Sequence, residues 1–289
     1  MDGESTNRAD GRATGDRPWR SVLYLPASNA RALDKARTLP ADAIIFDLED
    51  AVAPDAKAAA RDALAAALAE GGFGGRGRLV RINALSTEWG PADARTAAQM
   101  DCDGVLVPKV DGPDDLTAVA DLTGRPVWAM METPRGILTA LAIADAAAGL
   151  VVGTNDLAKD MGVAGRAALS AALQTCVLAA RAAGIPCIDG VCNAFRDDDA
   201  LAAECAEGRA MGMDGKSLIH PAQIAAANAA FAPSEAEVDL ALRQIAAFEA
   251  AVAAGQGLAV LDGRIVENLH VEGARRTLAR DRAIREMNA

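Results

Sequence analysis

The sequence predicts an α/β fold, a (β/α)8 TIM barrel with a C-terminal helix–hairpin–helix extension. Eight short apolar runs alternate with longer Ala- and Leu-rich stretches, as eight strand–helix units require. The runs lack polar alternation, which is typical of parallel strands buried on both faces. The 289 residues exceed the roughly 250 that such a barrel occupies. A doubly wound open sheet is the rival architecture, but no G-x-G-x-x-G motif follows a predicted strand.

The predicted elements follow one another in order along the chain. Each strand is a short run rich in Val, Ile and Leu, residues that favour extended structure. The strands are expected at Ser21–Leu25, Ala43–Asp47, Leu79–Ile82, Gly104–Val107, Val127–Met131, Leu150–Val152, Ile185–Asp189 and Gly215–Leu218. The stretches between them are rich in alanine, the best helix former. Examples are Asn29–Leu39, Pro54–Ala69, Asp114–Leu122 and Arg166–Ala183.

The pattern changes after about Pro233. Ser234–Ala254 reads as one long helix, because Ser234 and Glu237 form the pattern of a capping box. A Gly-Gln-Gly break and two short β runs joined by Asp262-Gly263 predict a hairpin, followed by a helix over Val271–Met287. We therefore expect a disordered leader at 1–18, a catalytic barrel at 19–232 and an extension at 233–289. Such an extension caps the barrel or reaches a neighbouring subunit, contributing to an oligomer and its active site.

Composition narrows the class of protein and its partners. Hydrophobic residues make up 51% and charged residues 24%, as in a soluble globular protein with a sizeable core. The net charge of −11 argues against nucleic acid and anionic membranes as partners. No run approaches the roughly 20 apolar residues of a membrane span, and the polar leader is no signal peptide. The five cysteines form no C-x-x-C pair, which favours reduced thiols in the cytoplasm.

Carboxylates follow two neighbouring predicted strands. Glu132 comes directly after the fifth strand, and Asp156 comes shortly after the sixth. Because the carboxyl ends of barrel strands share one face, these side chains should converge where such barrels carry their chemistry. Two hard oxygen ligands suit Mg²⁺, which keeps several waters and takes one or two carboxylates. The alternative is that each acid caps the helix that follows it.

Arg81 ends the third strand, and three acids follow the second in Asp47-Leu48-Glu49-Asp50. An arginine at the barrel mouth can hold a carboxylate or an enolate oxygen with two hydrogen bonds. The alternative is a structural ion pair with Asp47 or Glu49. Crowded carboxylates repel one another and gain from a nearby cation, either Mg²⁺ or Arg81. Lys109, after the fourth strand, could form a Schiff base, but a salt bridge into the acidic cluster is favoured.

Other catalytic classes find no support in the sequence. His220 precedes Pro221 at the end of the eighth strand and His270 lies in the extension, so neither suits a nucleophilic triad. No G-x-S-x-G motif is present to make a serine hydrolase.

Seven short motifs occur together and in order, and they cover the chain from about Arg20 onward. With them the chain resembles the citrate lyase β-subunit-like group of the HpcH/HpaI aldolase superfamily. The resemblance implies a Mg²⁺-dependent TIM barrel that acts on 3-hydroxyacyl-CoA thioesters such as malyl-CoA, citramalyl-CoA or citryl-CoA. The motifs are Leu25–Ser28, Ile45–Val52, Val80–Asn83, Val107–Lys109, Met131–Thr133, Gly153–Leu157 and Asp214–Ile224.

The resemblance also implies a role for individual residues. Glu132 and Asp156 would be the Mg²⁺ ligands, and Arg81 would bind the substrate carboxylate or the thioester enolate. Glu49 and Asp50 would stand behind the ligands and hold metal-bound water. Contacts to the CoA part of the substrate would come from His220 and Pro221, with Arg31 and Lys35 as partners of its phosphates.

The extension departs from the pattern of the family. Its lyases usually carry an aspartate after the hairpin, in a segment like Gly-x-Met-Ile-Asp-x-Pro, which acts as acid/base in a neighbouring subunit. Here Gly263–His270 matches this segment, with Glu267 at the aspartate position and no proline. The resemblance thus implies a homotrimer or homohexamer with Glu267 supplied in trans. A misplacement of about 1 Å can cost on the order of a hundredfold in rate, so the longer side chain leaves the reaction outcome open.

The expected function is a Mg²⁺-dependent CoA-ester lyase that cleaves a malyl-CoA-type substrate by a retro-Claisen reaction. The segment around Glu267 looks most like the (3S)-malyl-CoA thioesterase branch, so hydrolysis to malate and CoA is the first alternative. A citryl lyase component and a free 4-hydroxy-2-oxo-acid aldolase are further alternatives. A non-catalytic barrel serving as a binding module is the alternative from another class.

Overall fold

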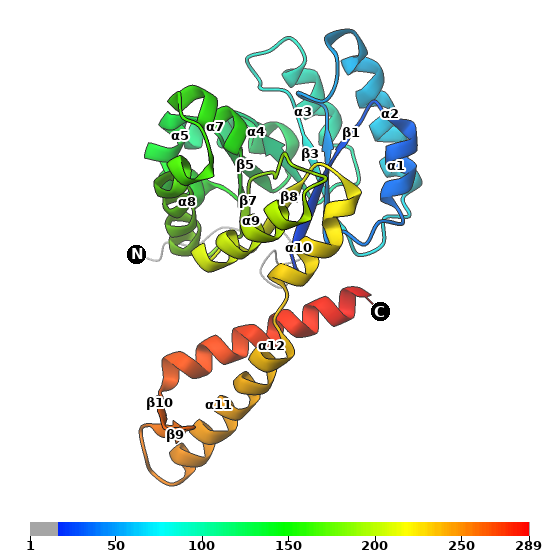
Figure 1. Cartoon of the computed structure of the whole chain (residues 1–289). Coiled ribbons are helices and arrows are strands. Elements are labelled where there is room, and N and C mark those ends of the chain that lie inside the picture. The colour runs from blue at the N-terminus through cyan, green and yellow to red at the C-terminus, as the bar shows by residue number, and fades with distance from the viewer. Residues whose placement is uncertain (1–16, 289) are drawn as a thin grey trace, which may run out of the picture.

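The computed structural model describes residues 17–288 and contains the predicted barrel. Eight parallel strands close in the order β1 to β8, with β1 hydrogen-bonded to β8 (Figure 1). The leader expected at 1–18 lies almost wholly outside the described residues. The strands are β1 (Ser21–Pro26), β2 (Ala43–Asp47), β3 (Gly77–Arg81), β4 (Gly104–Val107), β5 (Val127–Met131), β6 (Gly149–Val152), β7 (Cys187–Asp189) and β8 (Gly215–Leu218).

Helices surround the strands and differ from the predicted ones mainly at their ends. Asn29 caps the first helix, so that helix begins one residue later than predicted. The predicted helices at Pro54 and Arg166 both open with a short 3-10 turn. The helical elements of the barrel are α1 (Ala30–Ala36), η1 (Pro54–Ala56), α2 (Lys57–Glu70), α3 (Gly90–Ala97), α4 (Pro113–Thr123), α5 (Pro134–Leu138), α6 (Ala140–Ala146), α7 (Thr154–Met161), η2 (Arg166–Leu169), α8 (Ser170–Ala183), α9 (Asp198–Met211), η3 (Pro221–Gln223) and α10 (Ile224–Phe231).

The core has two layers. The larger one fills the space between strands and helices, and the smaller one fills the lumen of the barrel around Trp128. Trp128 fits because Gly104 and Gly149 flank it, and a side chain at Gly149 would collide with its indole ring. Trp19 packs against Trp128 with ring centroids 4.6 Å apart. Side chains therefore fill the lumen, and a ligand at the carboxyl ends of the strands would bind above this filled layer.

The predicted extension is present as α11 (Glu235–Ala253), the hairpin β9 (Ala259–Leu261) and β10 (Arg264–Val266), and α12 (Asn268–Asn288). Ser234 caps α11 in a capping box with Glu237, as the sequence predicts. Asp262 and Gly263 both have positive φ, which a two-residue type I′ turn requires. The final helix begins three residues earlier than predicted. Figure 1 shows the extension below the barrel, with the hairpin at its far end.

Within residues 17–288, no single helix has the length and apolarity to cross a membrane. The bent pair formed by α7 and η2–α8 meets the length and composition limits only when taken together.

Candidate active site

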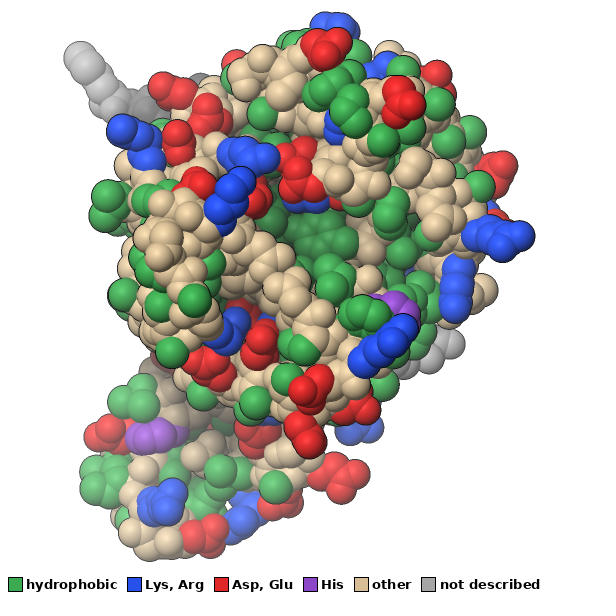
Figure 2. All heavy atoms as spheres, turned by 45° about the horizontal axis from the view of Figure 1, so that its top comes forward, with side chains coloured by type: hydrophobic (Ala, Val, Ile, Leu, Met, Phe, Trp, Pro, Cys, Tyr) green, Lys and Arg blue, Asp and Glu red, His purple; other side chains and the backbone are tan. Residues whose placement is uncertain are grey.

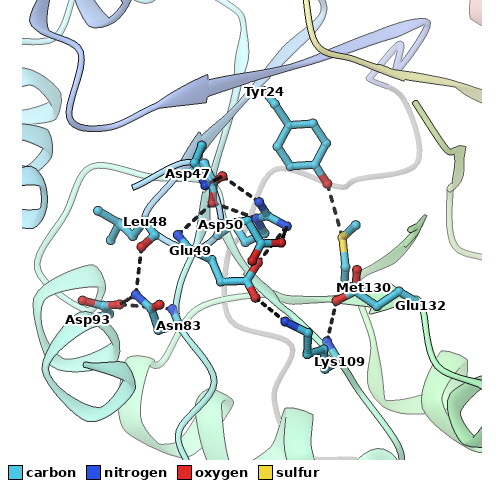
Figure 3. A network of polar contacts seen from close by, with 12 residues as sticks. Tyr24, Asp47, Leu48, Glu49, Asp50, Asn83, Asp93, Lys109, Met130 and Glu132 are labelled. Carbon is cyan, nitrogen blue, oxygen red and sulfur yellow. Dashed lines mark hydrogen bonds and ion pairs between the residues drawn. The ribbon is translucent and has the colours of Figure 1, made fainter. Parts of the chain in front are cut away.

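The carboxyl ends of the strands bring the predicted charged residues together. Asp47 ends β2 and pairs in register with Arg81, which ends β3. Lys109 follows β4, and Glu132 follows β5. Figure 2 shows a hollow at the top of the barrel, with hydrophobic side chains inside it and acidic and basic side chains along one edge. Figure 3 shows the polar network that these strand ends form.

Arg81 is fixed by Asp47. Its Nε and Nη2 donate to the two carboxylate oxygens of Asp47 at 2.7 and 2.6 Å, and both side chains are buried. Asp47 also accepts hydrogen bonds from the backbone N–H groups of Glu49 and Ala51. Burial alone would lower the pKa of Arg81, but the hydrogen bonds and charge of Asp47 raise it overall. The structural ion pair considered from the sequence is therefore present, and it holds the guanidinium in one orientation.

The remaining side of Arg81 faces the other two acids of the run. Nη1 lies 2.8 Å from Glu49 Oε2 and 3.6 Å from Asp50 Oδ2. Lys109 Nζ donates to Glu49 Oε1 at 2.8 Å, which confirms the predicted salt bridge into the acidic cluster. Although Arg81 is close, Glu49 Oε2 has no hydrogen bond of proper geometry among the described residues. Burial raises the pKa of Glu49 above its usual value, against the opposing effect of Arg81.

Buried hydrogen bonds position the loop that carries these acids. Lys57 Nζ donates to the backbone carbonyls of Leu48 and Glu49, both at 2.9 Å. Asn83 Nδ2 also donates to the Leu48 carbonyl, and Asp93 holds Asn83 in turn (Figure 3). The loop is thus tied to two neighbouring strand–helix units, which keeps the Glu49 side chain directed at the barrel mouth.

Glu132 lies almost completely buried in a space that two backbone features create. Lys109 has a φ of 52°, and its N–H donates to Glu132 Oε1 at 2.8 Å. A left-handed residue other than glycine costs energy and persists where the surrounding structure holds it. On the other side stands Gly153, where any added Cβ would collide with Glu132 Oε2. Lys109 and Gly153 therefore form a cradle that holds the carboxylate of Glu132 in one rotamer.

The charge of Glu132 is poorly compensated. Burial, together with the carboxylates of Glu49 and Asp156, raises its pKa to about 7 against the opposing effects of the Lys109 N–H and Arg81. Glu132 does not cap α5, because the side chain of Thr133 accepts the hydrogen bond from Gly136 N–H instead. Asp156 lies in the first turn of α7 without a side-chain hydrogen bond to the described residues, and Gly153 is the N-cap residue. The capping alternative for these acids is therefore wrong.

These residues fit a small, hard divalent cation. A buried carboxylate with a raised pKa gains from an added positive charge, and a second carboxylate stands close enough to repel it. Within the described part of the chain, no group of three His, Cys, Asp or Glu side chains could hold a metal. The protein would thus provide two oxygen ligands and leave the other positions to water and substrate, as Mg²⁺ sites commonly do.

Sequence reasoning missed Tyr24 and Gly153. The Tyr24 ring lies 5.1 Å from the guanidinium carbon of Arg81, and its hydroxyl donates to Met130 Sδ at 3.2 Å. Burial raises the pKa of Tyr24, so the hydroxyl stays protonated. Leu23 and Leu25 pack between the strands and the helices, so the two-residue period of a strand turns Tyr24 into the barrel. This period was the only sequence signal for its position.

The structure does not join the other predicted residues to this network. Arg31 and Lys35 are exposed on α1. His220 is an exposed N-cap whose Nδ1 accepts from Ala222 N–H, and its ring packs on Phe195. Glu267 is exposed in the extension, and its N–H donates to His270 Nδ1. Pro221 begins η3. The substrate contacts expected of them remain predictions.

Comparison with known proteins gives consistent results. The family described as HpcH/HpaI aldolase/citrate lyase matches residues 20–221. A (3S)-malyl-CoA thioesterase of Cereibacter sphaeroides is 56% identical over 94% of this chain and 98% of its own. The citrate lyase subunit beta of Escherichia coli is 33% identical over 91% and 93%. The protein CitE of Mycobacterium tuberculosis, crystallised with magnesium, acetoacetate and coenzyme A, superposes with a TM-score of 0.77 at 29% identity, covering 93% of this chain and 99% of that one.

Proposed function

Because the chain belongs to the HpcH/HpaI aldolase/citrate lyase family of enzymes, we propose that it hydrolyses a malyl-CoA-type thioester to malate and free CoA in a Mg²⁺-dependent reaction. The observation that carries this choice is the 56% identity to a (3S)-malyl-CoA thioesterase along nearly the whole of both chains. Citrate lyase β subunits, at 33%, are much more distant. The buried, poorly compensated Glu132 supports the need for a cation.

Glu132 and Asp156 would hold the Mg²⁺. When bound, the ion supplies a Lewis acid for oxygen atoms of the substrate. The Lys109 N–H fixes one oxygen of Glu132, and the missing side chain of Gly153 leaves room for the other. The chain thus orients one ligand before the ion arrives, which lowers the cost of ordering the site.

Arg81 and Glu49 would act on the thioester itself. With Nε and Nη2 bound to Asp47, Arg81 can direct Nη1 at negative charge that develops on the thioester oxygen. Glu49 Oε2 lacks a hydrogen bond and has a raised pKa, so it suits accepting a proton from an attacking water. The water oxygen bonds to the carbonyl carbon, the C–S bond breaks, and the sulfur leaves as the CoA thiol after taking up the proton. Asp50, beside Arg81, would stabilise the arginine in this orientation.

A lyase reaction is the second candidate. The same groups could support retro-Claisen cleavage to glyoxylate and acetyl-CoA, with Arg81 stabilising the thioester enolate. In its favour stand the citrate lyase relatives and a neighbour crystallised with acetoacetate and coenzyme A. Cleavage also requires a proton for the enolate carbon. Glu267 is the expected donor. It follows β10 of the extension, which lies below the barrel in Figure 1, whereas the network lies at the carboxyl ends of the strands, so a second subunit would supply it.

The proposal includes an assembly and a location. Residues 233–289 would carry Glu267 to a neighbouring subunit of a homotrimer or homohexamer, and His220, Pro221, Arg31 and Lys35 would contact CoA. All five cysteines are free thiols, which favours the reducing cytoplasm. Light scattering on the purified protein tests the assembly, and a monomer would exclude Glu267 in trans. Recovery of the native protein only from an oxidising compartment would exclude the location.

A product assay separates the two reactions. The protein is incubated with (3S)-malyl-CoA and Mg²⁺, and malate, glyoxylate, acetyl-CoA and free CoA are measured separately, with EDTA as a control. Hydrolysis gives malate and free CoA in equal amounts without glyoxylate, whereas cleavage gives glyoxylate and acetyl-CoA. Turnover unaffected by EDTA would contradict the Mg²⁺ site. If the Glu267→Gln variant keeps full hydrolysis, the tail carboxylate has no part in it.

Gly153→Ala tests the cradle around Glu132. The added Cβ would lie 2.5 Å from Glu132 Cβ and collide with Oε2, so the carboxylate must move. Displacement of a reacting group by about 1 Å costs on the order of a hundredfold in rate, and we expect such a loss of turnover. Gly153 has a φ of −96°, which alanine tolerates, so the effect is steric. Gly112→Ala is the matched control, because nothing lies within 4 Å of its Cβ position. Equal rates for both variants would contradict the cradle.

A further inference from the structure

A cavity of about 970 Å³ lies between the base of the barrel and the extension. Its barrel side includes Trp19, which precedes β1, and Asp214, which precedes β8. These residues stand at the amino ends of the strands, so the cavity is at the opposite end from Glu132. Its other side is formed by the start of α11 and by α12, which runs beneath the barrel in Figure 1.

The lining of this cavity is basic in a protein that is strongly acidic. Five arginines from the barrel and the extension face only two carboxylates, and the whole chain carries a net charge of −11. Clustered charge of one sign in a concave site concentrates counter-ions of the other sign. The arginines are Arg17, Arg181, Arg209, Arg276 and Arg280, and the carboxylates are Asp214 and Glu237.

Arg17 is paired with Asp103 outside the lining, at 3.2 Å, and the two lining carboxylates do not neutralise the other four arginines. Glu237 is occupied by Arg209, whose Nη2 lies 2.8 Å from both of its oxygens. Asp214 is shared between Arg181 at 2.9 Å and Arg280 at 3.5 Å. Burial lowers the pKa of Arg280, and the charges of Arg181 and Arg209 lower it further.

Arg276 stands one helical turn before Arg280, on the same face of α12. It has no ion pair or hydrogen bond to any residue that the structure describes. The cavity therefore holds positive charge that the described residues leave uncompensated.

Apolar surface adds a second kind of contact. Trp19, Ile185 and Phe231 line the cavity beside the arginines. Trp19 Nε1 is buried without a hydrogen-bond partner in residues 17–288, and such groups are rare enough to need an explanation. The volume falls at the upper end of the range of roughly 300–1,000 Å³ for small-molecule sites. A ligand larger than a single inorganic ion would fill it.

We propose that this cavity binds an organic anion with several carboxylate or phosphate oxygens, which bridges Arg181 of the barrel to Arg276 and Arg280 of the extension. Bound there, the anion would fasten α12 to the barrel base and fix how the extension projects. The site is independent of the reaction at the barrel mouth, because none of its residues belongs to the active-site network.

The test is calorimetric titration of the full-length protein with citrate and with ADP, which separate a carboxylate from a phosphate source. At least one should bind with a dissociation constant below about 1 mM. Arg276→Gln should weaken this binding by about tenfold, because a charged hydrogen-bond partner is lost. Arg276 is exposed and unpaired among the described residues, so the change should not disturb folding. Arg275→Gln is the matched control, since Arg275 is the exposed neighbour on α12 that does not line the cavity.

Two outcomes would overturn the proposal. One is that neither probe binds, and the other is that Arg276→Gln and Arg275→Gln bind as well as the parent. Anions could also enter the barrel mouth, so the titration is repeated with Arg81→Gln. Binding lost there but kept in Arg276→Gln places the probe at the mouth and likewise contradicts the proposal. Since the readout is binding, failure of the proposed hydrolysis would leave this result unaffected.

Discussion

Glu132→Gln should reduce turnover of the malyl-CoA-type substrate by about a thousandfold or more while making the metal-free protein more stable. A metal ligand contributes several kcal/mol to the stabilisation of developing charge, and each 1.36 kcal/mol corresponds to tenfold in rate. The amide keeps the shape of the side chain and can still accept from the Lys109 N–H. It removes the negative charge of a side chain that is only 2% exposed and is therefore poorly solvated.

The stability gain should depend on pH with a definite sign. Burial raises the pKa of Glu132 to about 7 in the folded protein, above its ordinary value of 4.5. Because the folded pKa is raised, protonated Glu132 stabilises the fold fully below pH 4.5, and this stabilisation is lost as the pH rises through 7. The amide needs no proton. In EDTA, the variant should therefore melt several degrees higher than the parent at pH 8 and nearly equally at pH 4.5.

Thermal unfolding at the two pH values, together with the product assay, checks this prediction. A parent protein that melts above the variant at pH 8 without metal would mean that Glu132 stabilises the fold. Undiminished turnover would remove it from the metal site. Asp62→Asn is a control, because this acid is exposed on α2 and has no ion pair or side-chain hydrogen bond with the described residues.

The sequence was sufficient to predict the barrel and the face on which its charged residues meet. Asp47, Arg81 and Glu132 stand at or directly after the ends of apolar runs. They therefore meet on one face once these runs form parallel strands of one barrel. What the sequence could not predict is which groups pair within that face. The bidentate bond between Asp47 and Arg81 depends on strand register, and the cradle of Glu132 depends on the left-handed backbone of Lys109. Neither feature has a local sequence signal.

The extension shows the same division between local and tertiary information. The capping box at Ser234 and the turn at Asp262-Gly263 are local chemistry, and both predictions are confirmed. The start of α12 at Asn268 was missed, because residues 268–270 carry no apolar period that continues the helix. The basic cavity could not be predicted, since its arginines come from segments that are brought together only when the extension packs under the barrel.

Lys216→Met should destabilise the protein by about 3–5 kcal/mol, the usual cost of breaking a buried ion pair on one side. Lys216 lies in β8 with 0% exposure, within the Asp214–Ile224 motif of the family resemblance. Its ammonium contacts Asp189 at 3.1 Å, Glu204 at 2.8 Å and the Gly190 carbonyl at 2.7 Å. Methionine fills the space but leaves the carboxylates of Asp189 and Glu204 without this cation.

Urea unfolding and thermal melts measure this loss, with a fall of roughly 10 °C expected for a chain of this size. Arg166 still pairs with Asp189 at 2.9 Å, so Glu204 carries most of the uncompensated charge. The double variant Lys216→Met/Glu204→Gln should therefore recover part of the stability, while Glu204→Gln alone should have a small effect. If Lys216→Met melts within a few degrees of the parent but loses CoA affinity, the lysine acts on the substrate. The buried contacts of Lys216 with β7 and α9 favour the opposite result, in which stability falls and the affinity of the folded fraction for CoA is retained.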